Sequence, residues 1–347
     1  MLNVEKKYRH VLSGHTFIDL FSGIGAFRIA LESFRARCVF SSEKDKHCKF
    51  VYKMNFGETP EDDITTIKEQ NIPKHTILCA GFPCQSFSIS GKQRGFKDTR
   101  GTLFFDIVRI AEYHKPKIIF LENVKNFERH DKGNTLKIIK CALNDIEYDV
   151  FYKVLNASLF GVPQKRERIY ILGFRKDLKI NNFTFPLPIK KYIKLKDVLL
   201  PDLKTKNYII NRKDISFKKE IAIKIDLYGN YPLKPIRVGT VNKGGQGERI
   251  YHECGHAITL SAYGGGIGAK TGLYLINGKV RRLAPRECAI IMGFPNTFKI
   301  HPSDSQAFKQ FGNSIVIDVL QAIILKIIKE GILNEQRTIN KIGITDS

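Results

Sequence analysis

The 347-residue chain has no tryptophan, only three methionines and far fewer acidic than basic residues. It has no apolar run of about 18 residues, and the N-terminal MLNVEKKYRHVLSGHTF lacks the apolar core of a signal peptide, so we expect neither a membrane span nor secretion. The seven cysteines are odd in number and scattered, which argues against a disulfide framework and favours a reducing, cytoplasmic location. An apolar share of 43% is ordinary for a globular protein, and the length allows one large domain or two.

The shortage of acidic residues leaves 57 Lys and Arg against 34 Asp and Glu, a formal net charge of +23. The excess is concentrated at 175–249, where 18 Lys and Arg stand against 7 Asp and Glu. Polyanions, above all nucleic acids, are the natural partners of such a surface. The alternative is the Lys-, Ile- and Asn-rich composition that an AT-rich genome produces, and the local concentration of charge argues against it.

Short apolar runs alternate with amphipathic segments in the first half of the chain. The runs predict strands at 16–21, 37–42, 75–80, 117–122, 149–156 and 168–174. Helical spacing between them predicts helices at 26–34, 46–56, 103–114 and 135–146. This alternation predicts an α/β fold with a mostly parallel sheet covered by helices on both faces.

The pattern changes after Phe185, where two prolines and a basic cluster interrupt it in FPLPIKKYIK. Glycine-dense segments with β-type alternation follow and predict a second, smaller domain of loops and short strands. Helical periodicity returns after Arg282, in PRECAIIMGF and SIVIDVLQAIILKIIKE. We therefore assign 1–196 and 313–347 to a large domain, 197–284 to the smaller domain and 285–312 to a hinge.

The segment FIDLFSGIGAFRIALES predicts a strand, a glycine-containing turn and a helix. Gly23 and Gly25 would let a ligand approach the backbone at the helix N-terminus. Glu43 ends the next strand, where a carboxylate can bind both ribose hydroxyls, and Asp63 is placed to reach the base. Arg28 stands where a dinucleotide site has its third glycine, so a nucleoside without a pyrophosphate, such as S-adenosylmethionine, fits better. Taken alone, Gly-x-Gly is equally consistent with a plain turn.

Two further strand ends carry polar side chains suited to catalysis. Glu122 follows the apolar run KIIFL at the carboxyl edge of the predicted sheet, where partial burial would let it act as a general acid. In QKRERIY, the alternating residues Gln164, Arg166, Arg168 and Tyr170 share one face of a strand. Paired arginines there could hold a base carbonyl and a phosphate. A solvated glutamate and salt-bridged arginines are the alternatives.

Cys84 stands in AGFPCQSFSISGKQRG, a loop that leaves the predicted strand HTILCA at the same edge. A thiolate is both a strong nucleophile and a good leaving group. Its addition to carbon 6 of cytosine, with acid assistance at ring nitrogen 3, would make carbon 5 nucleophilic enough to accept a methyl group. This scheme needs a cysteine, a carboxylic acid and a methyl donor, and neither metal nor histidine. The alternative is that Cys84 is a small buried hydrophobe.

Six motifs in order resemble the motif set of the DNA cytosine-C5 methyltransferases: FIDLFSGIGAF, GFPCQSFS, ENV, QKRERIY, PRECAIIMGFP and QFGNS. The resemblance runs from about Phe17 to Val319. It implies a Rossmann-like, S-adenosylmethionine-dependent methyltransferase sheet with a smaller target-recognition domain, and DNA (cytosine-5-)-methyltransferase activity. It also implies that Cys84 is the nucleophile, that Glu122 is the acid, and that Arg168, with Arg166, supports the cytosine carbonyl. The positions that match cofactor-binding residues of the family are Phe21, Gly23, Gly25, Glu43, Asp63, Ile64, Pro83, Leu103 and Asn313.

The segments GGQGERIY and AITLSAYGGGIGAKTG resemble a recognition segment of this family that reads GCGC, methylated at the inner cytosine. Ser90, Gln246, Arg249 and Tyr263 would then contact duplex DNA around an extruded base. The implied protein is a bacterial, cytoplasmic, monomeric modification enzyme with a cognate restriction endonuclease as its functional partner. The chain departs from the family pattern at Lys44, where an apolar or aromatic residue is usual, and at Ala26, where a glycine is common.

Three other classes of protein are less consistent with the sequence. A methyltransferase acting on RNA would lack the long glycine-rich segment at 236–275. A catalytically inactive DNA-binding protein would not need Cys84, Glu122 and Arg168 together. A dinucleotide oxidoreductase would need the missing third glycine. A zinc site is not expected either, because His252, Cys254 and His256 follow one another at every second residue.

Overall fold

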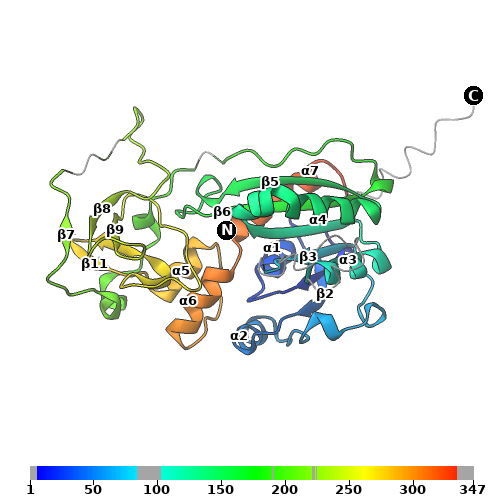
Figure 1. The fold of residues 1–347 in the computed structure, drawn as a ribbon, viewed down its shortest axis with the longest axis horizontal. Helices are drawn as coiled ribbons and strands as arrows, with labels where there is room; N and C mark the ends of the chain where they lie inside the picture. Colours follow the sequence, from blue (N-terminus) through cyan, green and yellow to red (C-terminus); the bar gives the residue numbers. More distant parts are fainter. Residues whose placement is uncertain (1–5, 84–102, 190, 221–222, 224, 334–347) are drawn as a thin grey trace, which may run out of the picture.

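The computed structural model describes residues 6–83, 103–189, 191–220, 223 and 225–333. Two sheets lie side by side, the larger one built from the first half of the chain and the smaller one from residues 216–281 (Figure 1). Cys84 and Ser90 lie outside the described residues.

The larger sheet has the strand order β2-β1-β3-β4-β6-β5. Its strands are β1 (Thr16–Leu20), β2 (Arg37–Ser42), β3 (Ile77–Ala80), β4 (Ile118–Val124), β5 (Tyr148–Asn156) and β6 (Glu167–Arg175). Strands β2, β1, β3 and β4 are parallel, whereas β6 is antiparallel to both of its neighbours. All six predicted strands are confirmed, each within two residues of its predicted limits.

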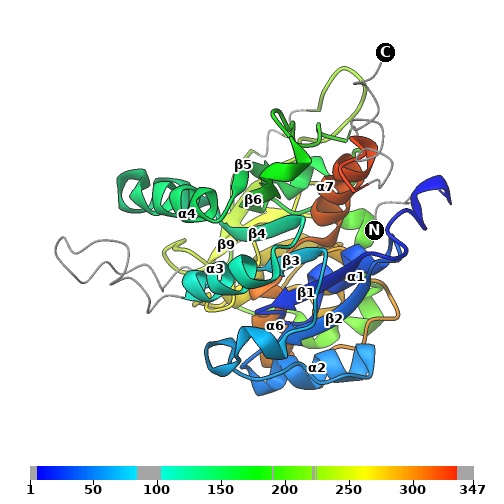
Figure 2. The same ribbon diagram turned by 90° about the vertical axis from the view of Figure 1, so that its right-hand side faces the viewer.

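Helices cover both faces of this sheet, as predicted (Figure 2). They are α1 (Ala26–Glu32), α2 (Lys46–Phe56), α3 (Leu103–His114), α4 (Asn134–Asp145) and α7 (Ile317–Lys329). Because side chains alternate along a strand, Phe17 packs in the core with α1 and α7, and Ile18 packs in the core with α3 and α4. This double cover buries the strands and leaves their carboxyl ends as the open edge.

The smaller sheet has the order β11-β10-β9-β8-β7 and a core of its own around Ile250 and Leu273. Its strands are β7 (Ser216–Phe217), β8 (Arg237–Thr240), β9 (Arg249–His252), β10 (Leu273–Ile276) and β11 (Lys279–Arg281). The glycine-dense segments pack backbone against backbone: Gly268 N donates to Gly247 O at 2.7 Å. A Cβ at Gly247 would lie 2.3 Å from Gly265 O, so this contact requires glycine. The five strands fall inside 197–284, and the exact domain limits stay a prediction.

Three helices follow the smaller sheet: α5 (Pro285–Ile291), α6 (Asp304–Asn313) and α7. Helices α5 and α7 are predicted from the sequence, whereas α6 is not, because DSQAFKQFGN holds few apolar residues and a glycine. Together α6 and α7 are long and apolar enough to cross a membrane, but 83% of their most apolar window is buried in the protein. Short 3-10 segments lie at Lys6–Tyr8, Ile64–Thr66, Glu69–Asn71, Lys125–Gly133, Ala157–Leu159, Lys176–Leu178, Leu195–Val198, Asp202–Lys204, Lys206–Tyr208 and Ala269–Thr271.

A buried ion pair ties the smaller sheet to α5. Arg281 on β11 donates to both carboxylate oxygens of Glu287, at 2.7 and 2.8 Å, and both side chains are almost fully buried. Glu287 also accepts from Ala284 N at 2.7 Å and from Leu200 N at 2.9 Å. The carboxylate therefore accepts four hydrogen bonds from three residues, Arg281, Ala284 and Leu200.

We predict that Glu287→Gln lowers the free energy of unfolding by about 3–5 kcal/mol, because it leaves the Arg281 charge buried without its partner. Chemical denaturation followed by circular dichroism measures the change. The control is Glu330→Gln, which removes the partner of Lys326 on the more accessible face of α7 and should cost about 0.5 kcal/mol or less. Equal losses in the two variants would contradict the prediction.

Candidate active site

Glu122 and Arg168 meet at the open edge of the larger sheet. The register of β4 and β6 pairs Glu122 with Tyr170 and Val124 with Arg168. Arg168 Nε lies 3.2 Å from Glu122 Oε1. Burial raises the pKa of Glu122, while the charges of Arg168 and Arg166 counteract that rise. The result is a carboxyl group that holds a proton more readily than a solvated glutamate and is kept in place by an arginine.

Arg166 is buried and donates only to backbone carbonyls among the contacts found in the described residues. Its guanidinium donates to Leu260 O at 3.0 Å, to Gly312 O at 2.8 Å and to Ser314 O at 2.6 Å. Burial, with the nearby charge of Arg168, lowers its pKa to about 9. These contacts join the segment just before β6 to the smaller domain and to the end of α6.

The predicted cofactor residues Gly23 and Glu43 are in direct contact. Gly23 N donates to Glu43 Oε2 at 2.8 Å, and Asp45 N donates to Glu43 Oε1 at 2.7 Å. Burial raises the pKa of Glu43, and the two N–H donors partly offset this. Phe21, between β1 and Gly23, has a left-handed backbone with φ of 55°. The turn after β1 and the end of β2 thus form one site.

Asp63 lies beside this site, and its carboxylate is engaged by Lys44. Lys44 Nζ lies 2.8 Å from Asp63 Oδ2, and Thr65 N donates to Asp63 Oδ1 at 3.1 Å. The hydrogen bond from Lys44 is the main reason that the pKa of Asp63 is lowered. Ile64, the next residue, is buried. Lys44, the residue that departs from the family pattern, therefore pairs with Asp63, the carboxylate predicted to reach the base.

The other predicted residues flank the same edge. Asn123 Nδ2 donates to Phe82 O at 3.0 Å and so fixes the backbone just before Pro83. A Cβ at Gly81 would lie 3.8 Å from Glu122 Oε2, so the backbone three residues before Cys84 passes beside the glutamate. Leu103 is the first residue of α3, and Asn313 is the last residue of α6 and is exposed. Gly25 begins α1 in the left-handed conformation.

These residues fit the nucleoside part of S-adenosylmethionine. A side chain at Gly23 would meet no atom within 4 Å, so open space lies beside the turn. Two carboxylates, Glu43 and Asp63, border this part of the chain and can accept from hydroxyl and amino groups. Backbone amides at the helix N-terminus supply donors.

The predicted DNA residues Gln246 and Arg249 line a hollow of about 400 Å³, together with Lys165, Glu167 and Tyr251. We call it the recognition hollow. Because Lys165 and Glu167 directly precede Arg168, the hollow connects the smaller domain with the beginning of β6. Gln246 and Arg249 are exposed there, and Arg249 Nε donates to Gly244 O at 3.4 Å.

Tyr263 is exposed but does not line the recognition hollow. His252, Cys254 and His256 have other contacts: His252 Nδ1 accepts from Cys254 N at 3.1 Å, and His256 lies 3.0 Å from Ser158 Oγ. Across the described part of the chain, no group of three or more His, Cys, Asp or Glu is arranged to hold a metal ion.

Sequence reasoning missed two residues that shape the site. Asp45 caps α2 and supports Glu43, and its place just before a predicted helix is a cap signal that could have revealed it. Asn123 fixes the backbone before Pro83. In the motif ENV, only Glu122 carries a group that suits acid catalysis, so the sequence did not single out Asn123. No local pattern shows that its amide reaches a carbonyl 41 residues earlier.

An α/β sheet whose carboxyl edge carries a buried acid, with open space beside a glycine turn, has the architecture of an α/β enzyme. Comparison with known proteins gives the family: residues 15–329 match the family model of the C-5 cytosine-specific DNA methylases. The chain belongs to this family. It is a DNA (cytosine-5-)-methyltransferase, and its methyl donor is S-adenosylmethionine.

Individual relatives agree with this membership. The chain is 59% identical to the type II methyltransferase M.HhaI of Haemophilus parahaemolyticus, over 90% of this chain and 94% of that protein. It is 41% identical to M.HpaII of Haemophilus parainfluenzae, over 91% of this chain and 89% of that protein. Among solved structures, Dnmt2 methyltransferase of S. pombe covers 92% of this chain and 99% of its own, with a TM-score of 0.67 at 18% identity. That likeness concerns the fold alone.

We predict that Gly23→Ala weakens binding of S-adenosylhomocysteine about tenfold or more, because the methyl group would enter the open space beside the turn. Titration calorimetry measures the affinity. Gly14→Ala is the control: it has the same left-handed backbone and no atom near its Cβ, but it precedes β1 at the opposite edge. Both variants should lose roughly 1–2 kcal/mol of stability. An unchanged affinity in Gly23→Ala would contradict the assigned site.

Proposed function

We propose that this enzyme methylates carbon 5 of a cytosine extruded from duplex DNA, through a covalent adduct with Cys84. The observation that carries the proposal is the contact of Glu122 with Arg168 beside Gly81. It supports an acid held next to the loop that leads to Cys84. The target we infer is the inner cytosine of GCGC, which rests on the resemblance of GGQGERIY and AITLSAYGGGIGAKTG.

The proposed reaction begins when the Cys84 thiolate adds to carbon 6 of the cytosine. Glu122 donates a proton to ring nitrogen 3, so the electrons of the 5,6 double bond become available at carbon 5. S-adenosylmethionine, when bound, supplies an electrophilic methyl group. Loss of the carbon-5 proton to a base, with return of the nitrogen-3 proton to Glu122, then restores the 5,6 double bond and expels the thiolate. Arg168 keeps Glu122 in place and is positioned to donate to the cytosine carbonyl.

The chain's own residues supply the binding. Glu43 would accept from the ribose hydroxyls and Asp63 from the base, while the Gly23 turn leaves room for both. Gln246 and Arg249 project into the recognition hollow beside β6, where they would contact the bases around the extruded cytosine. The charge of +23 supports binding through phosphates.

The biological role we propose is that of the modification enzyme of a type II restriction system. The identity to M.HhaI over nearly the whole of both chains supports this role. The enzyme would act as a monomer in the bacterial cytoplasm and protect the sites that a cognate endonuclease cuts. That endonuclease is a functional partner and need not bind the enzyme.

Replacing the nucleophile tests the covalent mechanism. Cys84→Ser should lose methyl transfer by at least roughly a thousandfold, because a hydroxyl is a far weaker nucleophile, while DNA binding persists. DNA with 5-fluorocytosine at the target should trap the wild-type enzyme in a denaturation-resistant adduct, since fluorine does not leave as a proton does. Cys141→Ser, on α4, is the control and should behave as wild type. Methyl transfer by Cys84→Ser within tenfold of wild type would exclude the mechanism.

Arg249 should read a guanine. We expect Arg249→Ala to relax base preference at one guanine of GCGC, at a cost of roughly 1–3 kcal/mol, because a guanidinium can donate to both O6 and N7. Methylation and binding of single-base variants of the site measure this. Arg212→Ala removes an arginine of the same domain that pairs with Asp214 and does not line the hollow, and it should leave preference unchanged. An equal loss on every DNA variant would make Arg249 a phosphate contact.

A further inference from the structure

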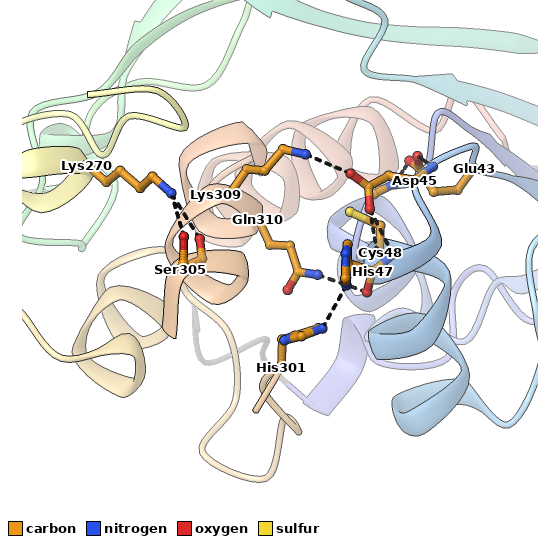
Figure 3. A network of polar contacts seen from close by, with 10 residues as sticks. Glu43, Asp45, His47, Cys48, Lys270, His301, Ser305, Lys309 and Gln310 are labelled. Carbon is orange, nitrogen blue, oxygen red and sulfur yellow. Dashed lines mark hydrogen bonds and ion pairs between the residues drawn. The ribbon is translucent and has the colours of Figure 1, made fainter. Parts of the chain in front are cut away.

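Helix α6 lies between the smaller domain and the cofactor site, and polar side chains connect it to both (Figure 3). Near its beginning, Lys270 of the smaller domain donates to Ser305 O at 3.1 Å and lies 3.3 Å from Ser305 Oγ. One turn later, Lys309 Nζ lies 2.9 Å from Asp45 Oδ2. The helix therefore has one lysine contact with the recognition side and another with the turn after β2.

Two more contacts hold the first turn of α2 against α6. Gln310 Nε2 donates to His47 O at 2.9 Å. His47 Nδ1 lies 3.1 Å from Nε2 of His301, just before α6, so a hydrogen bond joins the two imidazole rings. Figure 3 shows these side chains on the same side of α6 as Lys309. The contact between α6 and this turn thus has three polar connections.

Asp45 is the residue through which these contacts reach the cofactor site. Its Oδ1 accepts from His47 N at 2.8 Å and from Cys48 N at 3.3 Å, which caps α2. Its Oδ2 is engaged by Lys309, and these partners together hold the pKa of Asp45 below its usual value despite partial burial. With its side chain fixed at both oxygens, Asp45 presents its backbone N–H to Glu43 Oε1 at 2.7 Å.

Glu43 is in turn held at both of its oxygens, by Asp45 N and by Gly23 N. A partly buried carboxylate held by two backbone donors keeps one orientation, and here the two donors belong to different segments of the chain. The donor from Gly23 belongs to the turn after β1. The donor from Asp45 belongs to a residue whose side chain contacts Lys309, 264 residues away in the sequence.

We propose that Lys309 is a positioning residue for S-adenosylmethionine: it fixes Asp45, and through the Asp45 backbone it fixes the ribose-binding orientation of Glu43. The inference rests on the proposed role of Glu43. Because Lys270 ties the same helix to the smaller domain, the orientation of Glu43 depends on the helix that also supports DNA recognition.

The test is Lys309→Met, which keeps an unbranched side chain and removes the charge. Its control is Lys326→Met: the Lys326–Glu330 pair has the same 2.9 Å separation, and both lysine side chains are 31% exposed, but Lys326 lies on α7 away from Glu43. Calorimetry with S-adenosylhomocysteine should show affinity reduced about five- to tenfold in Lys309→Met and unchanged in the control. The KM for S-adenosylmethionine should rise by the same factor, with kcat at saturation within about twofold.

Rescue and non-additivity separate positioning from general structure. Lys309→Arg retains the cation and should restore the affinity to within about threefold of wild type. Asp45→Asn keeps the helix cap, and adding Lys309→Met in that background should weaken binding no further, since Lys309 acts through Asp45. Additive losses would overturn the proposal, as would an affinity equal to that of Lys326→Met.

A different role for Lys309 would leave another signature. If Lys309→Met weakened binding to duplex DNA and lowered the salt dependence by about one charge, the lysine would be a phosphate contact and the proposal would fail. Glu43→Gln separates this inference from the function on which it rests. If Glu43→Gln did not weaken binding of S-adenosylhomocysteine, the role of Glu43 itself would be wrong. If it did and Lys309→Met did not, only the role of Lys309 would fail.

Discussion

The reversed direction of β6 is the constraint on which the active site depends. In a sheet of parallel strands, side chains at the beginning of a strand lie at the edge opposite to the ligand site. Because β6 runs antiparallel to β4, its beginning meets the carboxyl end of β4, and Arg168 comes to lie 3.2 Å from Glu122. Had β6 been parallel, the arginine would have reached the far edge and left the buried carboxyl without a cation. The pairing also brings Lys165 and Glu167, which line the recognition hollow, to the same edge of the sheet as Glu122.

Buried cations attach the smaller domain to this edge. Arg166 donates to carbonyls of the smaller domain and of the α6 end, and Arg281 pairs with Glu287 across the junction with α5. Burying an arginine is costly unless its charge is paired or hydrogen-bonded, so such contacts tolerate little displacement. The contacts of Arg166 and Arg281 hold the smaller domain in one position relative to the rest of the chain. The exposed lysines elsewhere on the chain remain available to phosphates.

Much of the fold follows from local patterns. The alternation of apolar runs predicts all six strands of the larger sheet, and apolar periodicity predicts α1 to α4, α5 and α7. The pattern works because the central strands β1, β3, β4 and β6 are buried along most of their length, and α1 to α4 each have a buried face. Helix α6 escapes prediction because few of its residues are apolar, and Phe308 and Phe311 are buried in a core formed by segments distant in the sequence, which no local pattern shows. The order of the parallel strands and the antiparallel direction of β6 likewise cannot be predicted from any short stretch of the sequence.

The sequence by itself determined the chemistry of the site. Gly23, Glu43, Glu122 and Arg168 in their motifs predict a nucleoside site, an acid and a base-binding arginine, because such roles depend on functional groups at strand ends, and these roles stay predictions. Only the tertiary structure decided which groups meet. It separated Arg166 from Arg168, turning one toward backbone carbonyls and the other toward Glu122. It also joined Lys309 to Asp45 across 264 residues, since hydrogen bonds and burial depend on distance in space and not on distance along the chain.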